Sequence, residues 1–186
     1  VQYATVLNNL AGTYRLAGKY EEAADLFHES ALIYSTTIGK DNSYYCSILN
    51  NLALVYQDMK EYGKAEEMLA NALKSSRTLK NSQMDVAITY SNLGALYLEM
   101  GDYERAEEDL RESVDIYEQL DTNHQVHLAS VYNSLGILYY KQGKLEEAKA
   151  AYQQALELTL YHYGKNHEYE ILCRNIAAIE EAVQEA

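Results

Sequence analysis

Proline and tryptophan are absent from this chain of 186 residues, and phenylalanine occurs once. The 9 glycines lie near expected turns, so no segment has the composition of a flexible linker or a disordered tract. No apolar run approaches the ~18 residues of a membrane-spanning helix, and no signal peptide is visible. Because the chain begins inside a periodic segment, we expect it to be a fragment of a longer protein.

Cysteine is nearly absent too. Cys46 and Cys173 are too few for a disulfide framework, and they lie three repeats apart in the pattern described below. A disulfide needs Cα atoms within ~7 Å, so we expect both thiols to stay free as small buried hydrophobic groups. This fits a reducing, cytoplasmic location.

Basic residues are in short supply. The chain has 15 Lys and Arg against 28 Asp and Glu, a formal net charge of −13. Residues 85–126 alone hold 2 basic and 11 acidic residues. Phosphate binding needs a basic stripe, so neither nucleic acid nor an anionic membrane is an expected partner.

The clearest positive feature is an internal repeat. Leu7-Asn-Asn-Leu10-Ala11 returns as Leu49-Asn-Asn-Leu52-Ala53, and weaker copies follow around Leu93, Leu135 and Ile176. The steps between the second leucine positions are 42, 41, 42 and 41 residues. A fixed period of this size is typical of a solenoid, in which each unit buries its apolar face against its neighbours.

Each repeat reads as two helices. In the first repeat, the spacing of Ala4, Leu7, Leu10, Ala11 and Tyr14 predicts one helical face, and Gly18 ends that helix. A second apolar face then starts at an aromatic residue. Four kinds of slot recur: a tyrosine, a turn residue, a small residue and a bulky residue. The tyrosines are Tyr14, Tyr56, Tyr97 and Tyr139, and the turn residues are Gly18, Lys60, Gly101 and Gly143. The small residues are Ala23, Ala65, Ala106 and Ala148, and the bulky residues are Phe27, Leu69, Leu110 and Tyr152.

These slots resemble the tetratricopeptide repeat. The loop patterns Gly39-Lys-Asp-Asn42 and Gly164-Lys-Asn-His167, with the doubled asparagine, are similar to the 42-residue variant of kinesin light chains and many bacterial proteins. The sequence departs from the family in having Leu or Tyr where Trp is common and no Pro at the repeat ends. The resemblance implies an all-α, right-handed superhelix of helix pairs that binds proteins or peptides.

We therefore expect a single tetratricopeptide domain over residues 1–186. Its four helix-turn-helix repeats should cover residues 1–42, 43–84, 85–126 and 127–167, and a further helix should cover 168–184. Glu180 replaces the tyrosine in that last helix, which favours a solvating cap, as the ends of solenoids need. A truncated repeat remains the alternative.

No catalytic or cofactor site is expected. His124 and His127, near Asp121, lack the third and fourth ligands of a zinc site. Gly39-Lys40 and Gly164-Lys165 lack the flanking glycines of a phosphate loop, and no Ser–His–acid group recurs. We predict a protein that is not an enzyme and needs no metal or cofactor.

The resemblance implies that the first helices line a concave groove. The side of these helices opposite the packing residues is rich in amides and hydroxyls, which can hydrogen-bond an extended peptide backbone. The candidate groove residues are Asn8, Asn9, Asn50, Asn51, Gln57, Ser91, Asn92, Asn133, Ser134, Tyr140, Arg174 and Asn175. The alternative is that these asparagines bond to neighbouring helices and hold the repeats in register.

The sequence thus favours a protein–protein interaction module that binds an extended peptide or protein segment. Two alternatives stay open: a structural or oligomerising spacer without a groove ligand, and a sensor module of a larger regulator. A chaperone-type carboxylate clamp is excluded, because slots such as Asn8 and Asn92 carry no Lys or Arg. The acidic stretch from Asp102 to Glu118 reads as a solvated face, with docking of a basic partner as the alternative. The oligomeric state is not predicted.

Overall fold

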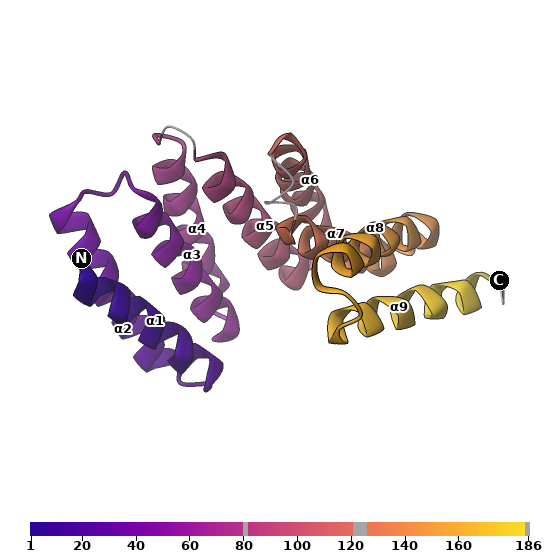
Figure 1. Cartoon of the computed structure of the whole chain (residues 1–186), viewed down its shortest axis with the longest axis horizontal. Coiled ribbons are helices and arrows are strands. Elements are labelled where there is room, and N and C mark those ends of the chain that lie inside the picture. Colours follow the sequence, from indigo (N-terminus) through magenta and orange to yellow (C-terminus); the bar gives the residue numbers. More distant parts are fainter. Residues whose placement is uncertain (80–81, 121–125, 185–186) are drawn as a thin grey trace. The chain divides into compact units, whose positions relative to one another are not determined.

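The computed structural model describes residues 1–79, 82–120 and 126–184, and every regular element in those ranges is an α-helix. The helices, labelled in Figure 1, are α1 Gln2–Leu16, α2 Tyr20–Thr37, α3 Ser43–Asp58, α4 Tyr62–Ser76, α5 Gln83–Met100, α6 Tyr103–Gln119, α7 Val126–Lys141, α8 Leu145–Tyr163 and α9 His167–Gln184. The prediction of an all-α fold is confirmed.

The turn inside each repeat needs a left-handed backbone. The φ angles are 74° at Gly18, 63° at Lys60, 80° at Gly101 and 74° at Gly143. Glycine adopts this conformation without a steric cost, whereas other residues adopt it at a cost of roughly 1 kcal/mol. Lys60 takes the same geometry because the helices on both sides fix it.

The longer turns between repeats start the next helix with an asparagine cap. The Asn42 Oδ1 accepts the backbone N–H of Tyr45 at 2.8 Å. In the equivalent turn, the Asn166 Oδ1 accepts the N–H of Tyr169 at 2.9 Å. Each cap satisfies one of the backbone donors left open at a helix start.

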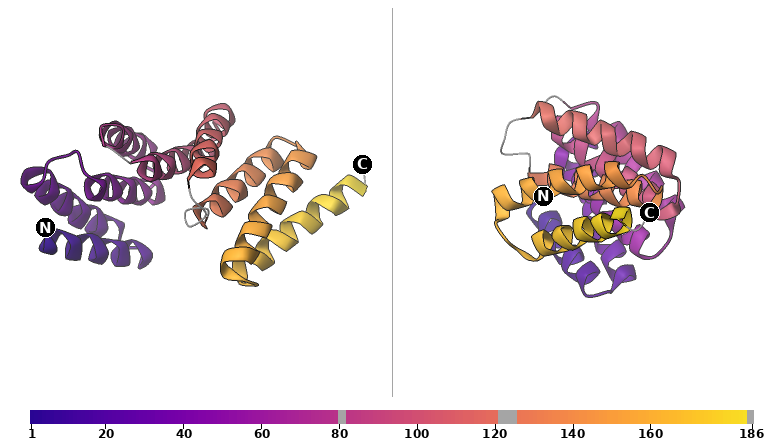
Figure 2. Two further views of the ribbon diagram at one scale, coloured as in Figure 1. Left: turned by 45° about the horizontal axis from the view of Figure 1, so that its top comes forward. Right: turned by 90° about the vertical axis from the view of Figure 1, so that its right-hand side faces the viewer.

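Contacts divide the chain into two compact units, Val1–Leu96 and Tyr97–Ala186, with the boundary inside α5. In the first unit α1 packs on α2, α3 on α4, and α2 on α3. In the second unit α7 packs on α8, α6 on α7, and α8 on α9 (Figure 2). The same two kinds of contact thus recur in each unit, within a repeat and between successive repeats. The single continuous stack expected from the sequence stays a prediction.

Small residues let the paired helices approach closely. Ala23, Ala65, Ala106 and Ala148, the predicted small slot, are all fully buried. The bulky slot four residues later is buried as well, at Phe27, Leu69, Leu110 and Tyr152. Small side chains thus alternate with large ones between the paired helices, as close packing of a core requires.

The first helix of each repeat is also covered by the second helix of the repeat before it. Ile48, Val131 and Leu172 occupy equivalent positions on the covered face of α3, α7 and α9, and they are 2%, 0% and 0% exposed. Val6, the equivalent residue of α1, is 61% exposed, because no described helix precedes α1. The comparison shows how much burial each first helix owes to its predecessor.

The last helix ends in polar contacts. The Glu180 carboxylate of α9 lies 2.7 Å from the Lys149 ammonium of α8. The acidic residue in the tyrosine slot therefore binds back onto the preceding repeat. This geometry fits the predicted cap over residues 168–184, which stays a prediction.

Gly136 in α7 and Tyr152 in α8 form a close crossing of a helix backbone and a side chain. A Cβ atom added at Gly136 would lie 2.5 Å from the Tyr152 ring, well inside contact distance. The equivalent positions in the first two repeats pair Ala11 with Phe27 and Ala53 with Leu69. The missing side chain at Gly136 leaves room for the Tyr152 ring.

We predict that Gly136→Ala lowers the free energy of unfolding by about 1–3 kcal/mol, because the added methyl group overpacks the crossing. Adding Tyr152→Leu should recover much of this loss, since Leu69 faces an alanine in the second repeat. A double-mutant cycle by urea denaturation measures the coupling. Additive effects of the two changes would contradict this account.

Candidate interaction surface

Four asparagines connect the first helices of the first unit. The Asn51 Nδ2 of α3 donates to the Asn8 Oδ1 of α1 at 3.4 Å. The Asn92 Nδ2 of α5 donates to the Asn50 Oδ1 of α3 at 2.8 Å. We call these four residues the amide ladder. Its bonds join neighbouring repeats, as the register-holding alternative expected.

Asn50 is the most deeply placed member of the ladder. It is only 5% exposed, and its Nδ2 donates to the Cys46 carbonyl and to the Thr89 Oγ1, both at 3.0 Å. Its Oδ1 accepts from Asn92. With both donors and the acceptor satisfied inside the protein, Asn50 serves the packing of α3 against α5.

Ionic and hydroxyl contacts strengthen the same junctions. The Arg15 Nε of α1 lies 2.6 Å from the Asp58 Oδ2 of α3. The Ser43 Oγ of α3 donates to the Asp85 Oδ2 of α5 at 2.6 Å. The polar side chains of one first helix are thus fixed by those of the next.

The remaining candidate residues lie at different depths. Asn9 is exposed, and the other first-unit candidates are half-buried: Asn8, Asn51, Gln57, Ser91 and Asn92. In the second unit, Tyr140 and Arg174 are exposed and Asn133, Ser134 and Asn175 are half-buried.

Among the residues that the structure describes, the second-unit candidates form no ladder bond of the kind seen in the first unit. The Ser134 Oγ donates to the Ser130 carbonyl at 3.1 Å, and the Arg174 Nε to the Glu170 carbonyl at 3.4 Å. The buried Asn133 Oδ1 has no hydrogen-bond partner among the described residues. The structure therefore brings together Asn8 with Asn51 and Asn50 with Asn92.

The histidine pair considered for a metal falls partly outside this description. Asp121 and His124 lie outside the described residues, whereas His127 is the second residue of α7 and stacks on Tyr117. Within residues 1–79, 82–120 and 126–184, no group of three or more metal-ligating side chains comes together. None of the helices there is long and apolar enough to cross a bilayer.

Two stretches, residues 2–78 and 85–160, match the model of the Tetratricopeptide repeat family. The chain belongs to the tetratricopeptide repeat family. Over 68 residues it is 34% identical to "Tetratricopeptide repeat protein 19 homolog, mitochondrial" of Drosophila melanogaster. That stretch is 37% of this chain and 18% of the relative, so the chain spans less than a fifth of the relative's length.

Solved structures show the same fold. The crystal structure of a putative kinesin light chain from Podosopora anserina, with nearly identical TPR-like repeats, has a TM-score of 0.74 at 21% identity, covering 97% of this chain and 87% of that one. BtubC (BKLC) from P. vanneervenii has a TM-score of 0.74 at 23% identity, covering 88% of this chain and 65% of that one. The resemblance to the kinesin-light-chain type of tetratricopeptide repeat is thereby confirmed.

The tyrosine slot of this tetratricopeptide chain makes a joint that the sequence analysis did not foresee. A cation lies over each of the four rings, at 5.3 Å for Lys19 and Tyr14, 5.2 Å for Lys64 and Tyr56, 4.1 Å for Arg105 and Tyr97, and 5.5 Å for Lys144 and Tyr139. Each such contact contributes roughly 0.5–1 kcal/mol. Every cation comes from the turn or the start of the second helix, so the tyrosine links the two helices of its repeat.

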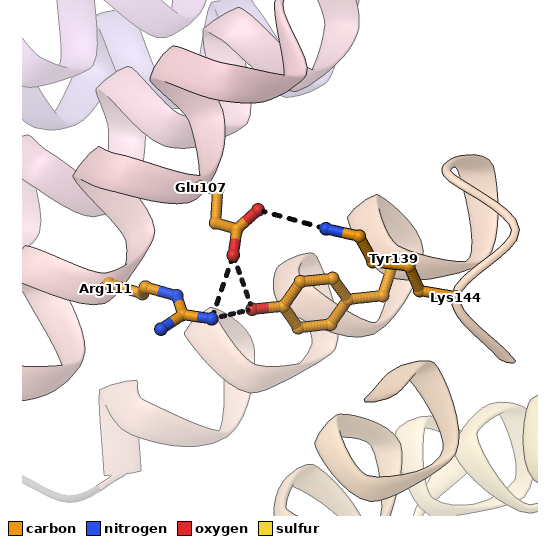
Figure 3. A network of polar contacts seen from close by, with 4 residues as sticks. All are labelled: Glu107, Arg111, Tyr139 and Lys144. Atoms are coloured by element: carbon orange, nitrogen blue, oxygen red, sulfur yellow. Dashed lines mark hydrogen bonds and ion pairs between the residues drawn. The ribbon is translucent and has the colours of Figure 1, made fainter. Parts of the chain in front are cut away.

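Two of these tyrosines also bind the preceding repeat. The Tyr56 hydroxyl lies 2.8 Å from the His28 Nε2 of α2. In the second unit, Arg111 of α6 donates to the Tyr139 hydroxyl at 3.0 Å, and this hydroxyl donates to the Glu107 carboxylate at 3.2 Å. Figure 3 shows Glu107 bound by Arg111, Tyr139 and Lys144 together. The cation contacts of the tyrosine slot could have been found in the sequence, because a basic residue follows each of the four tyrosines by five or eight positions.

The acidic helix α6 has a stabilising carboxylate at its start and an unfavourably placed one, Asp109, in its middle. Asp102 caps α6, and its bonds with Arg105 hold the pKa of that carboxyl below its usual value. Burial, the largest cause, and the charges of Glu108 and Glu112 together raise the pKa of Asp109 to about 6, against the lowering effect of Arg105. The slot of Asp109 holds Leu26 and Met68 in the first two repeats, so a carboxyl group occupies a place built for an apolar side chain.

The amide ladder makes a prediction about stability. Asn92→Ala would leave the Oδ1 of the buried Asn50 unpaired, which costs about 1–3 kcal/mol. For a chain of this size we expect the Tm to fall by a few degrees. Asn175→Ala, the same change in the same slot of α9, is the matched control and should shift the Tm by much less. Equal Tm values for the two variants in a calorimetric scan would contradict the ladder.

Asp109 makes a prediction about pH. Because its folded pKa lies above the unfolded value near 3.8, the folded protein binds this proton more tightly, and stability should rise as the pH falls from about 6 to 4. Asp109→Asn should stabilise the protein at pH 7.5 by ~1 kcal/mol, a value reduced because the carboxyl is partly exposed. Denaturation at several pH values tests this, with exposed Glu104→Gln as the control. A variant no more stable than the parent at pH 7.5 would refute the assignment.

Proposed function

We propose that this tetratricopeptide chain is an interaction module that binds an extended peptide across the first helices of its first unit. Asn51 and Asn92 are the central contacts of the proposal. Each uses its Nδ2 in the amide ladder. The Oδ1 atom of each has no hydrogen-bond partner among the described residues, and neither Oδ1 is fully buried. These two free carbonyl oxygens, each held by its own amide nitrogen, are the observation that carries the proposal.

A fixed acceptor favours binding because little freedom is lost when a ligand arrives. First helices that pack ~10 Å apart match about three residues of extended chain, at ~3.3 Å per residue. Backbone N–H groups of one peptide can therefore reach both oxygens. Each bond contributes about 0.5–1.5 kcal/mol, which suits a moderate affinity assembled from several contacts.

The charge on this surface supports recognition of the peptide backbone. Asn9 and Ser47 are exposed and neutral, and the Arg15–Asp58 pair neutralises itself. Affinity should therefore depend little on salt, since few ion pairs would form with the ligand. Asn50 is left out of the binding role because its amide is already satisfied inside the protein.

The remaining features of the proposal follow from the family. Tetratricopeptide repeats serve as protein-binding scaffolds, so we propose a protein or peptide partner and no catalytic activity of the chain itself. Cys46 and Cys173 are both free thiols, which supports a reducing compartment such as the cytoplasm. A spacer array without a ligand is the competing proposal, and the amide ladder by itself would suit it equally well.

Asn51→Ala separates the two proposals. We would select 12-residue peptides from a random display library on the parent chain and measure their affinity by fluorescence anisotropy. The variant should raise the Kd about 3–10-fold, the loss of one backbone hydrogen bond, with little change in Tm because its ladder bond is long at 3.4 Å.

Asn175→Ala is again the matched control and should leave the Kd unchanged. The spacer proposal expects the opposite result, in which Asn51→Ala lowers the Tm and selected peptides bind both proteins equally. A Kd that collapses between low and physiological salt would also contradict a neutral binding surface.

A further inference from the structure

A groove of about 570 Å³ lies between α6 and α8 of the second unit, whereas the residues of the proposed peptide surface belong to the first unit. Its α6 wall runs from Arg111 to Glu118 and its α8 wall from Glu147 to Gln154, so each wall is two helical turns long. Val114, Leu135 and Ala151 form an apolar floor. The volume lies within the ~300–1,000 Å³ of typical ligand pockets.

In this α6–α8 groove the basic group has an ion-pair partner, whereas the acidic groups have none among the described residues. Arg111, its single basic residue, is already bound to the Glu107 carboxylate at 2.9 Å and to Tyr139 (Figure 3). Asp115, Glu118 and Glu147 are exposed, and none has an ion-pair partner among the described residues. The rim therefore offers three uncompensated carboxylates above an apolar floor.

Tyr132 adds an aromatic surface and fixes one of these carboxylates. Its hydroxyl donates to the Glu118 Oε1 at 3.0 Å. Burial and the bond to Glu118 raise the pKa of Tyr132 to about 12, so the hydroxyl stays protonated and remains a donor. The second oxygen of Glu118 is left for a ligand.

We propose that the α6–α8 groove docks an arginine-bearing segment of a protein partner, with an apolar side chain next to the arginine. Asp115 and Glu118 are three residues apart and therefore neighbours on one face of α6. A guanidinium group donates in a planar fork to carboxylates and stacks on aromatic rings, so it matches both acids and Tyr132 better than an ammonium group does. The apolar neighbour covers Val114 and Leu135.

Charge complementarity selects this partner over the others. Acidic peptides and nucleic acids would be repelled by the rim carboxylates. A second copy of this chain carries 28 acidic and 15 basic residues, so it is also a poor match. Attraction between a basic segment and the acidic helix α6 raises the rate of encounter as well as the affinity.

The test is a titration of the isotope-labelled chain followed by NMR. The probe is a synthetic peptide, Gly-Arg-Leu-Arg-Gly with both ends blocked, and the control peptide has citrulline in place of each arginine. We expect saturable shifts of the amide signals of Val114, Ala150 and Ala151. Asp115→Asn with Glu118→Gln should raise the Kd at least tenfold, and added salt should weaken binding.

Two further variants isolate the groove. Glu104→Gln with Glu108→Gln removes the same charge from exposed positions of α6 outside the groove and should change the Kd by less than twofold. Ala150→Leu, at an exposed position of the groove wall, keeps every charge and should abolish the shifts by filling the space. The first-helix variant Asn51→Ala should not affect this titration.

The proposal is overturned if no saturable shifts occur at these residues or if the citrulline peptide binds equally well. It is also overturned if Glu104→Gln with Glu108→Gln weakens binding as much as the groove pair does, because binding would then follow the general charge of α6. Failure here leaves the first-helix proposal standing, since that surface lies in the other unit.

Discussion

Each first helix of this protein depends on burial from two sides. Its partner helix covers one face through the small alanine slot, and the second helix of the preceding repeat covers the other. Where both covers are present, Ile48, Val131 and Leu172 are almost fully buried. In α1, which no described helix precedes, Val6 is 61% exposed. A single helix pair of this size has too little apolar surface to offset its conformational entropy, so neighbouring repeats stabilise each other.

That dependence explains why polar groups gather at the junctions. Because apolar burial is not directional, it does not by itself fix how far one helix is shifted along the next. The amide ladder, the Arg15–Asp58 pair and the Tyr56–His28 bond each form in one register only. A side chain that fixes the register with its nitrogen can still present its oxygen to a ligand, which is how one row of asparagines can serve both structure and binding.

The sequence predicted the fold well because each structural position occurs once in every repeat, so the same residue pattern is seen several times. The left-handed turn at Lys60, for example, follows from the glycines in the equivalent slots. The depth of Asn50 could not be predicted, because it depends on whether Thr89 on another helix accepts its amide. The α6–α8 groove was equally hidden, since a space between helices depends on exact side-chain directions. The acidic residues on its rim were visible in the sequence, but the floor beneath them was not.

The central claim is that the amide ladder holds Asn51 and Asn92 ready to bind a peptide backbone. The most direct measurement is a crystal structure of the chain with a peptide selected on it. The account predicts peptide nitrogens at about 2.7–3.2 Å from the Oδ1 atoms of Asn51 and Asn92, with the bond between Asn92 and Asn50 intact. A peptide bound elsewhere, with both oxygens facing solvent, would contradict it.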